Sequence, residues 1–238
     1  MFKRKYFKIK IFADGADVGA MKRVHKEGTV QGFTTNPTLM RKAGVDDYEL
    51  FARSVLREIK DLPISFEVFS DEFEQMEKDA RKIAKWGANV NVKIPVTNTN
   101  GESSRALIKK LSAEGIPLNV TAILTVEQVE DVIAVLSKKT PSIISVFAGR
   151  IADTGRDPVV YMKKAAAIVK NNPCASLLWA SSRELLNIFQ AESAGCHIIT
   201  VTDEILKKII LIEKDLMDLS LDTVKMFYKD AQLAGYKI

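Results

Sequence analysis

The chain has 238 residues, 47% of them hydrophobic and 27% charged, which is enough to bury a full core as one ordinary globular domain. No apolar run approaches the ~20 residues that a membrane-spanning helix needs, and residues 1–8 are too basic and too often interrupted for a signal peptide. The net charge of +5 suits an anionic ligand, but basic and acidic residues are interspersed, so neither nucleic acid nor membrane is an expected partner.

Cysteine and histidine usage argues against a metal site and favours a cytoplasmic protein. Cys174 and Cys196 lack metal-ligand spacing, and they fit small buried residues in a reducing compartment. His25 and His197 are the only histidines of the sequence, and neither neighbours a second plausible metal ligand. We therefore expect no metal and no histidine-based catalytic triad.

Runs with strand character alternate with amphipathic helical runs along the whole chain. The predicted strands cover residues 8–13, 30–35, 64–69, 89–94, 117–123, 142–147, 175–180 and 197–201. The predicted helices include residues 17–26, 50–59, 73–84, 106–111, 129–136, 157–169, 183–194, a short segment from 203, and 219–233. Capping-box patterns, Asp46-x-x-Glu49 and Thr125-x-x-Gln128, precede two of these helices, and Gly235 marks the end of the last one.

Eight such strand–helix pairs with short connections predict an α/β fold, the (β/α)8 TIM barrel. The chain shows no linker, so we expect a single domain over residues 1–238. Within it, residues 1–7 form an N-terminal extension and residues 219–238 a C-terminal helix and tail. A doubly wound open sheet is the alternative. Its glycine-rich loop is missing after the first strand, because Asp14-Gly-Ala-Asp does not match G-x-G-x-x-G.

The strand at 89–94 carries a lysine near its carboxyl end. Val90, Val92 and Ile94 point to one face and Lys93 to the other, and both faces are expected to be buried. Lys93 is then either a structural lysine, which reaches solvent or pairs with a carboxylate, or a Schiff-base amine. Burial favours the second role because it lowers a lysine pKa and frees the nucleophilic neutral form. The remaining strands favour the amine.

Period-two alternation on the other strands places polar side chains on inner faces near the carboxyl ends, where barrel active sites are built. The residues assigned to these faces are Phe12, Asp14, Thr34, Asn36, Ser65, Glu67, Asn119, Thr121, Ser145, Phe147, Trp179 and Ser181. Some have a structural role available: Asp14 can cap a helix, and Ser181-x-x-Glu184 is a capping box. Glu67 is the hardest to explain in this way, because an unpaired buried carboxylate is costly. Together these residues indicate a catalytic pocket.

Seven short stretches carry a likeness to a known family. They are Phe12-Ala-Asp14, Gly32-Phe-Thr-Thr-Asn-Pro37, Ser65-Phe-Glu67, Val92-Lys-Ile-Pro-Val-Thr97, Asn119-Val-Thr121, Ser145-Val-Phe-Ala-Gly-Arg150 and Ala180-Ser-Ser-Arg183. In order and spacing they resemble the transaldolase family, in its short branch that includes fructose-6-phosphate aldolase. The resemblance covers nearly the whole chain after the N-terminal extension. The T-T-N-P and V-K-I-P-V-T segments are the pieces specific to the family.

The resemblance implies a class I aldol mechanism without cofactor or metal. Lys93 would form a Schiff base with the ketose carbonyl, and Asp14 would take the proton of the C4 hydroxyl. Glu67 would move protons through a water held by Thr121. The expected substrate-binding residues are Thr34, Asn36, Asn119, Ser145, Phe147, Arg150, Ser181 and Arg183. Of these, Asn36, Asn119 and Ser145 would hold dihydroxyacetone hydroxyls. The terminal phosphate would lie against Arg150, Ser181 and Arg183, unless the arginines only form exposed ion pairs.

The activity implied is that of a transaldolase, which moves a dihydroxyacetone unit from a ketose phosphate to an aldose phosphate in the pentose phosphate pathway. Glu67 and Phe147 resemble the transaldolase pattern, whereas the fructose-6-phosphate aldolases have Gln and Tyr there. The alternatives are an aldolase that releases free dihydroxyacetone, and a specialised transferase for another anionic sugar, for which Gly15 leaves room. A further alternative is a sugar-phosphate-binding barrel without catalysis, in which Lys93 only pairs with a carboxylate.

The resemblance also implies a homo-oligomer, a pentamer or decamer in which the C-terminal helix reaches a neighbouring subunit. The last predicted helix has an apolar stripe that fits either this arrangement or packing within the chain. Its residues are Leu219, Leu221, Val224, Phe227 and Tyr228.

Overall fold

The computed structural model describes residues 7–237. The predicted N-terminal extension at 1–7 therefore lies, apart from Phe7, outside the described residues. The chain divides into two compact units, Met1–Leu206 and Lys207–Ile238. The expectation of one domain over the whole chain stays a prediction. None of the helices within residues 7–237 is long and apolar enough to cross a membrane.

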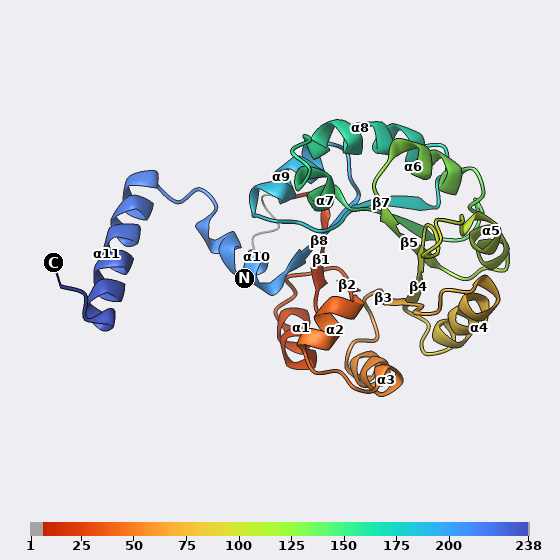
Figure 1. Cartoon of the computed structure of the whole chain (residues 1–238), viewed down its shortest axis with the longest axis horizontal. Helices are drawn as coiled ribbons and strands as arrows, with labels where there is room; N and C mark the ends of the chain where they lie inside the picture. The colour runs from red at the N-terminus through yellow and green to blue at the C-terminus, as the bar shows by residue number, and fades with distance from the viewer. Residues whose placement is uncertain (1–6, 238) are drawn as a thin grey trace. The chain divides into compact units, whose positions relative to one another are not determined.

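The first unit is a closed barrel of eight parallel strands in sequential order, with helices around its outside (Figure 1). The strands are β1 (Lys10–Asp14), β2 (Phe33–Thr34), β3 (Ile64–Glu67), β4 (Val90–Pro95), β5 (Leu118–Ile123), β6 (Ser142–Val146), β7 (Ala175–Trp179) and β8 (Ile198–Thr202). The helices are α1 (Val18–Lys26), α2 (Pro37–Lys42), α3 (Tyr48–Glu58), α4 (Phe73–Ala84), α5 (Arg105–Ala113), α6 (Val126–Ile133), α7 (Ala148–Ala152), α8 (Pro158–Val169), α9 (Leu186–Ser193) and α10 (Asp203–Lys207). The predicted (β/α)8 barrel is confirmed.

The core has an outer layer between strands and helices and an inner layer inside the barrel. Phe66, Val92 and Leu118 are fully buried, as expected for strands that are covered on both faces. Inside, an apolar cluster fills the barrel on one side; it consists of Phe12, Ile143, Leu178, Ala180 and Ile198. A Cβ atom at Gly32 would lie 2.5 Å from the ring of Phe12. Gly32 is therefore required for the Phe12 ring to occupy the barrel interior.

Helix boundaries differ from the sequence expectations at several points. The N-cap of α3 is Asp47 rather than Asp46: its side chain accepts a hydrogen bond from the Leu50 amide at 2.9 Å. This makes Tyr48 the first helical residue. The capping box of Thr125 and Gln128 is confirmed.

Two short helices, α2 and α7, were not predicted from the sequence, and the second predicted strand is longer than the strand observed. α2 follows β2 directly, because Asn36 caps its first turn and proline is favoured at the first helical position. α7 begins immediately after β6. β2 has only two residues rather than the six predicted.

The second unit contains a 3₁₀ helix (Lys208–Leu211) and α11 (Leu216–Ala234). Asp215 caps the start of α11, and Gly235 ends it in the left-handed conformation with φ 68°. All residues of α11 are described, and none of its side chains is buried. The apolar stripe predicted for this helix is exposed.

Candidate active site

A cavity of about 390 Å³ opens at the carboxyl ends of the strands. Its lining contains every residue to which the sequence analysis gave a catalytic or substrate-binding role: Asp14, Thr34, Asn36, Glu67, Lys93, Asn119, Thr121, Ser145, Phe147, Arg150, Ser181 and Arg183. These residues come from strands and loops all around the barrel. The structure thus brings the predicted set together, and it adds others, among them Ala122, Ser182, Thr200 and Thr202.

Lys93 is buried inside the barrel, with 6% of the residue exposed. It is the register partner of Glu67 across β3 and β4, and its Nζ lies 3.0 Å from Glu67 Oε2. The same Nζ donates a hydrogen bond to the backbone oxygen of Thr35 at 2.7 Å. A lysine and a carboxylate therefore meet directly inside the cavity, where a proton can pass between them.

Asp14 is the second carboxyl group of the cavity. Its Oδ1 accepts a hydrogen bond from the Thr34 hydroxyl at 2.8 Å, and its Oδ2 accepts one from Nδ2 of Asn36 at 3.2 Å. Burial raises the pKa of Asp14 above its usual value, while the Lys93 charge and these two hydrogen bonds act in the opposite direction. The carboxyl group consequently keeps its proton to a higher pH than an exposed aspartate does, which suits a group that exchanges protons.

Asn119 is held by two serines in a buried chain of hydrogen bonds. Nδ2 of Asn119 donates to Oγ of Ser65 at 3.0 Å, and Oγ of Ser145 donates to Oδ1 of Asn119 at 2.7 Å. All three residues are at most 3% exposed. These bonds fix the direction in which the amide presents its donor and acceptor atoms to the cavity.

Thr121 lies where the pairing of β5 with β6 becomes irregular. The register shifts between Val120 and Ile123, and Ala122 adopts a positive φ of 62°. The Thr121 hydroxyl is buried and has no hydrogen-bond partner among the described residues. A buried hydroxyl without a partner costs free energy, so this atom is suited to a bound water or ligand.

One end of the cavity is basic. Arg150 and Arg183 both lie there, and Arg183 forms a two-point ion pair with Asp153 in which Nε lies 3.1 Å from Oδ1. The hydrogen bonds of Arg183 lower the pKa of Asp153. Asp153 was not anticipated, because only the fold brings α7 against the loop after β7.

The prediction that Trp179 and Ser181 share an inner face is wrong. Leu178 and Ala180 line the cavity, whereas Trp179 is fully buried and is the register partner of Val146, which the alternation places on the outer face. Ser181 reaches the cavity because its backbone is left-handed, with φ 59°. This reverses the simple alternation.

The capping box predicted for Ser181 and Glu184 is also absent. α9 begins later, at Leu186, and has no side-chain cap. Instead, Oδ1 of Asn187 accepts hydrogen bonds from the backbone amides of Arg183 and Glu184, at 2.7 and 3.2 Å. Ser181 is therefore not occupied in capping this helix.

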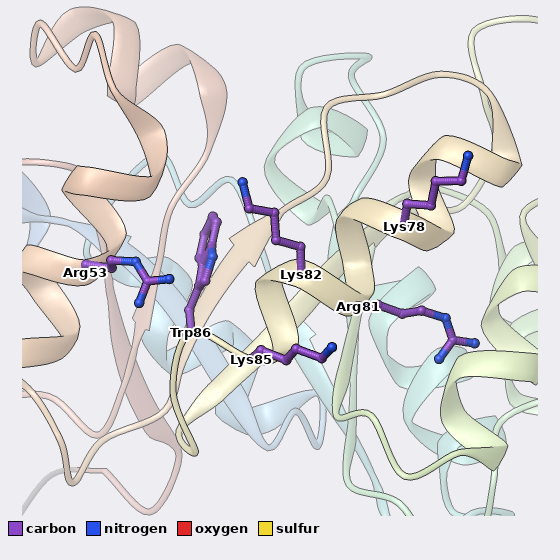
Figure 2. A pocket seen from close by; sticks show the side chains of 6 residues that line it. All are labelled: Arg53, Lys78, Arg81, Lys82, Lys85 and Trp86. Atoms are coloured by element: carbon purple, nitrogen blue, oxygen red, sulfur yellow. The ribbon is translucent and has the colours of Figure 1, made fainter.

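A different hollow lies on the outside of the barrel, over α3 and α4 (Figure 2). Its lining is basic and consists of Arg53, Lys78, Arg81, Lys82, Lys85 and Trp86. Figure 2 shows Arg53 and Lys82 on either side of Trp86. The carboxylate of Glu49 forms ion pairs with Arg53 and Lys82, at N–O distances of 2.7 and 2.6 Å. Since much of this charge is matched by acidic neighbours, the barrel cavity is the candidate active site. Among residues 7–237, no group of three or more His, Cys, Asp or Glu side chains could hold a metal ion.

The fold and the cavity define a (β/α)8 barrel that carries a buried lysine beside a carboxylate at the carboxyl ends of its strands. The chain belongs to the transaldolase/fructose-6-phosphate aldolase family, whose model matches residues 11–237. It is 36% identical over 202 residues to "Probable transaldolase 2" of Listeria monocytogenes, a match that covers 84% of this chain and 88% of the relative. It is 34% identical over 232 residues to "Probable transaldolase" of Thermoanaerobacter sp., covering 97% and 100%.

A solved structure supports the fold. The crystal structure of KGPDC from Streptococcus mutans superposes with a TM-score of 0.57 and covers 84% of this chain and 90% of that one. The sequence identity is 10%, so this likeness concerns the barrel fold alone.

Proposed function

We propose that this protein is a transaldolase, which transfers a dihydroxyacetone unit from a ketose phosphate to an aldose phosphate through a Schiff base on Lys93. The observation that carries the proposal is the buried Nζ of Lys93 at 3.0 Å from Oε2 of Glu67. Buried lysines that can lose their proton are suited to imine chemistry. The names of the relatives support the same activity.

The first step joins Lys93 to the donor sugar. The neutral amine attacks the C2 carbonyl of the ketose, and the carbinolamine that forms loses its hydroxyl as water to give an iminium. A proton must leave the nitrogen and another must reach the departing oxygen. We assign this exchange to Glu67, with a water on the unpartnered hydroxyl of Thr121 as the intermediate carrier.

The second step cleaves the C3–C4 bond. Asp14 takes the proton from the C4 hydroxyl, the bonding electrons move into the iminium, and the shortened aldose leaves. An enamine remains on Lys93. An acceptor aldehyde then adds to the enamine carbon, Asp14 returns the proton to the new hydroxyl, and hydrolysis of the iminium releases the longer ketose.

The other cavity residues bind the substrate. Asn36, Asn119 and Ser145 hold the hydroxyls of the three-carbon unit, and Thr34 keeps Asp14 in place through its 2.8 Å hydrogen bond. Arg150, Arg183 and Ser181 bind the terminal phosphate, since arginine forms strong charge-assisted bonds with phosphate oxygens. All of these groups line one cavity, which supports their working together.

An aldolase that releases free dihydroxyacetone is the second candidate. The family shown includes fructose-6-phosphate aldolase by name, so this activity remains within the family. Phe147 packs against the apolar cluster of the barrel and supports the transferase, because its ring offers no hydrogen bond to a hydrolytic water. A transferase for another anionic sugar and a binding protein without catalysis are further candidates.

A panel assay separates these candidates. The protein is incubated with fructose 6-phosphate or sedoheptulose 7-phosphate, with and without erythrose 4-phosphate or glyceraldehyde 3-phosphate, and both transfer product and free dihydroxyacetone are measured. We expect transfer to exceed release. Release at an equal rate without acceptor identifies the aldolase, and binding with neither product identifies the sugar-phosphate-binding barrel.

We also propose that the protein acts as a homo-oligomer, a pentamer or decamer, in the cytoplasmic pentose phosphate pathway. The exposed apolar residues of α11, such as Val224 and Phe227, support an association through this helix. The mass of the purified protein in solution tests this.

A further inference from the structure

The hydroxyl of Tyr48 binds both backbone groups of Glu67. The Glu67 N–H donates a hydrogen bond to Tyr48 Oη at 2.7 Å, and the Tyr48 O–H donates one to the Glu67 carbonyl oxygen at 2.9 Å. Tyr48 is the first residue of α3, whose N-cap is Asp47. A side chain from a helix thus takes the place of a neighbouring strand at the end of β3.

The reason lies in how β2 ends. The β2–β3 ladder continues as far as the Thr35 amide, which donates to the Ser65 carbonyl oxygen at 3.3 Å. In a continued parallel ladder, the next acceptor for the Glu67 N–H would be the Thr35 carbonyl, and the next donor would be the amide of residue 37. The Thr35 carbonyl instead accepts from Nζ of Lys93 at 2.7 Å. Residue 37 is a proline, which has no N–H.

Tyr48 supplies the two groups that the chain cannot. Its oxygen replaces the carbonyl that is used by Lys93, and its proton replaces the amide that Pro37 lacks. On its other side β3 remains paired with β4, where the Val68 amide donates to the Lys93 carbonyl oxygen at 3.1 Å. The backbone of Glu67 is consequently held from both sides, although β2 has already ended.

The tyrosine is itself fixed. Its ring packs against Phe69, Trp86 and Phe66 at centroid distances of 4.6, 5.3 and 6.2 Å. Burial raises the pKa of Tyr48 above that of a free tyrosine, so the hydroxyl stays protonated and able to donate. Tyr48 lines a hollow on the outer side of the barrel, which Glu67 also borders.

We propose that Tyr48 is a positioning residue for the reaction, which holds Glu67 at the distance from Lys93 that proton exchange requires. The proposal rests on the proposed function, in which Glu67 moves the protons of Schiff-base formation. Tyr48 acts through the backbone of Glu67 and does not bind the sugar.

The test is Tyr48→Phe, which keeps the ring and removes the hydroxyl. We expect kcat, and the rate at which borohydride traps the fructose 6-phosphate adduct, to fall about ten- to a hundredfold, because small misplacements of reacting groups cost this much. The donor KM should change less than threefold or so, since Tyr48 acts only on the chemical step. Trp86→Phe is the matched control for packing, because it thins the same ring cluster but leaves the Tyr48 hydroxyl in place.

A double-mutant cycle with Glu67→Gln decides whether Tyr48 works through Glu67. We expect Tyr48→Phe to have little further effect on trapping in the Glu67→Gln background. An equal loss in both backgrounds, or an equal loss in Trp86→Phe, means that Tyr48 is only structural and overturns the proposal.

The controls separate this proposal from the proposed function. If Glu67→Gln traps the adduct at the wild-type rate, Glu67 has no part in proton exchange and the Tyr48 proposal fails, while the trapped adduct still supports the Schiff base; if the wild type traps no adduct, the proposed function itself fails. If Glu67→Gln is slow but Tyr48→Phe is not, the proposed function stands and Tyr48 alone is wrong. Should Tyr48→Phe not fold, Tyr48→Met also removes the hydroxyl, and wild-type kcat in that variant also overturns the proposal.

Discussion

Lys93 and Glu67 face each other across β4 and β3, with Nζ and Oε2 3.0 Å apart and the lysine almost completely buried. A buried charge without a partner is strongly destabilising, so each residue makes the other tolerable inside the barrel. The same contact places a potential nucleophile beside a proton acceptor. The contact between Lys93 and Glu67 therefore both stabilises the two buried charges and supplies the groups of the proposed reaction.

Lys93 should be the residue that carries the covalent intermediate. Treatment with fructose 6-phosphate and borohydride should add the mass of a reduced dihydroxyacetone unit to the peptide containing Lys93. Lys93→Arg should show no adduct and no activity, because arginine keeps the charge beside Glu67 but stays protonated. Lys85→Arg, in the outer hollow, should be labelled like the wild type. Label on another lysine of the active protein would end the hypothesis.

Arg150 and Arg183 should distinguish phosphorylated from non-phosphorylated substrates. A charge-assisted contact of about 1.5–3 kcal/mol corresponds to a loss of roughly ten- to a hundredfold in kcat/KM when either is changed to alanine. Fructose or dihydroxyacetone as donor should be affected far less. Arg156→Ala, an exposed arginine that bonds Thr154, serves as the control. Equal losses for both kinds of substrate would show that the arginines are structural.

Phe147→Tyr should shift the protein from transfer towards release. The enamine on Lys93 waits for an acceptor, and release requires its protonation and then hydrolysis of the iminium. A tyrosine hydroxyl in this cavity can hold a water or pass a proton, and one positioned proton carrier is worth about 10²-fold or more. Free dihydroxyacetone formed without acceptor should therefore increase, and the ratio of transfer to release should fall. An unchanged ratio would assign Phe147 to packing alone.

Asp14→Asn should slow catalysis strongly and stabilise the fold at neutral pH. Burial raises the pKa of Asp14. The folded state therefore loses stability as the pH rises from the pKa of an exposed aspartate through the raised value, because the buried carboxylate must ionise. Asparagine does not ionise, so the free energy of unfolding should exceed that of wild type at pH 7, and the difference should vanish in acid. Activity should fall by about 10²–10⁴.

Urea denaturation at several pH values measures this difference. Asp17→Asn is the control, because Asp17 only caps α1 and asparagine caps equally well. A gain in stability for Asp14→Asn that is independent of pH would contradict the assignment to ionisation.

Gly149→Ala should destabilise the phosphate end of the cavity. A Cβ atom at Gly149 would lie 1.6 Å from the carbonyl oxygen of Ser181, so α7 and the loop after β7 would have to separate. Overpacking of this kind costs about 1–3 kcal/mol, occasionally more. Gly15→Ala is the control, since a Cβ there meets nothing within 4 Å. Equal stability of both variants would mean that α7 and the loop after β7 can move apart at no measurable cost in free energy.

The barrel and most of the cavity could be predicted because both depend on alternation along strands. Glu67, Lys93 and Asn119 lie one beside the other on adjacent strands, as period-two counting requires. Thr200 could have been found in the same way, by extending the count to the eighth strand. Its hydroxyl lies 2.6 Å from that of Thr34.

The remaining features depend on backbone departures and long-range contacts that counting does not detect. Ser181 enters the cavity through a left-handed residue, and Ala122 marks an extra residue in β5. Tyr48 and Asp153 meet Glu67 and Arg183 only when helices have packed against strand ends. No local pattern in the sequence predicts these contacts, because they join residues that are far apart along the chain.

The apolar cluster around Phe12 has a kinetic consequence. The cluster packs the barrel on one side, and barrels of this kind are filled by side chains and are not open pores, so the cavity opens at the carboxyl ends of the strands. In the proposed reaction, the first aldose must then leave through the same mouth by which the second enters. Donor and acceptor therefore bind alternately through the same opening of the cavity. Initial rates measured against both sugars should give the parallel double-reciprocal lines of a ping-pong enzyme.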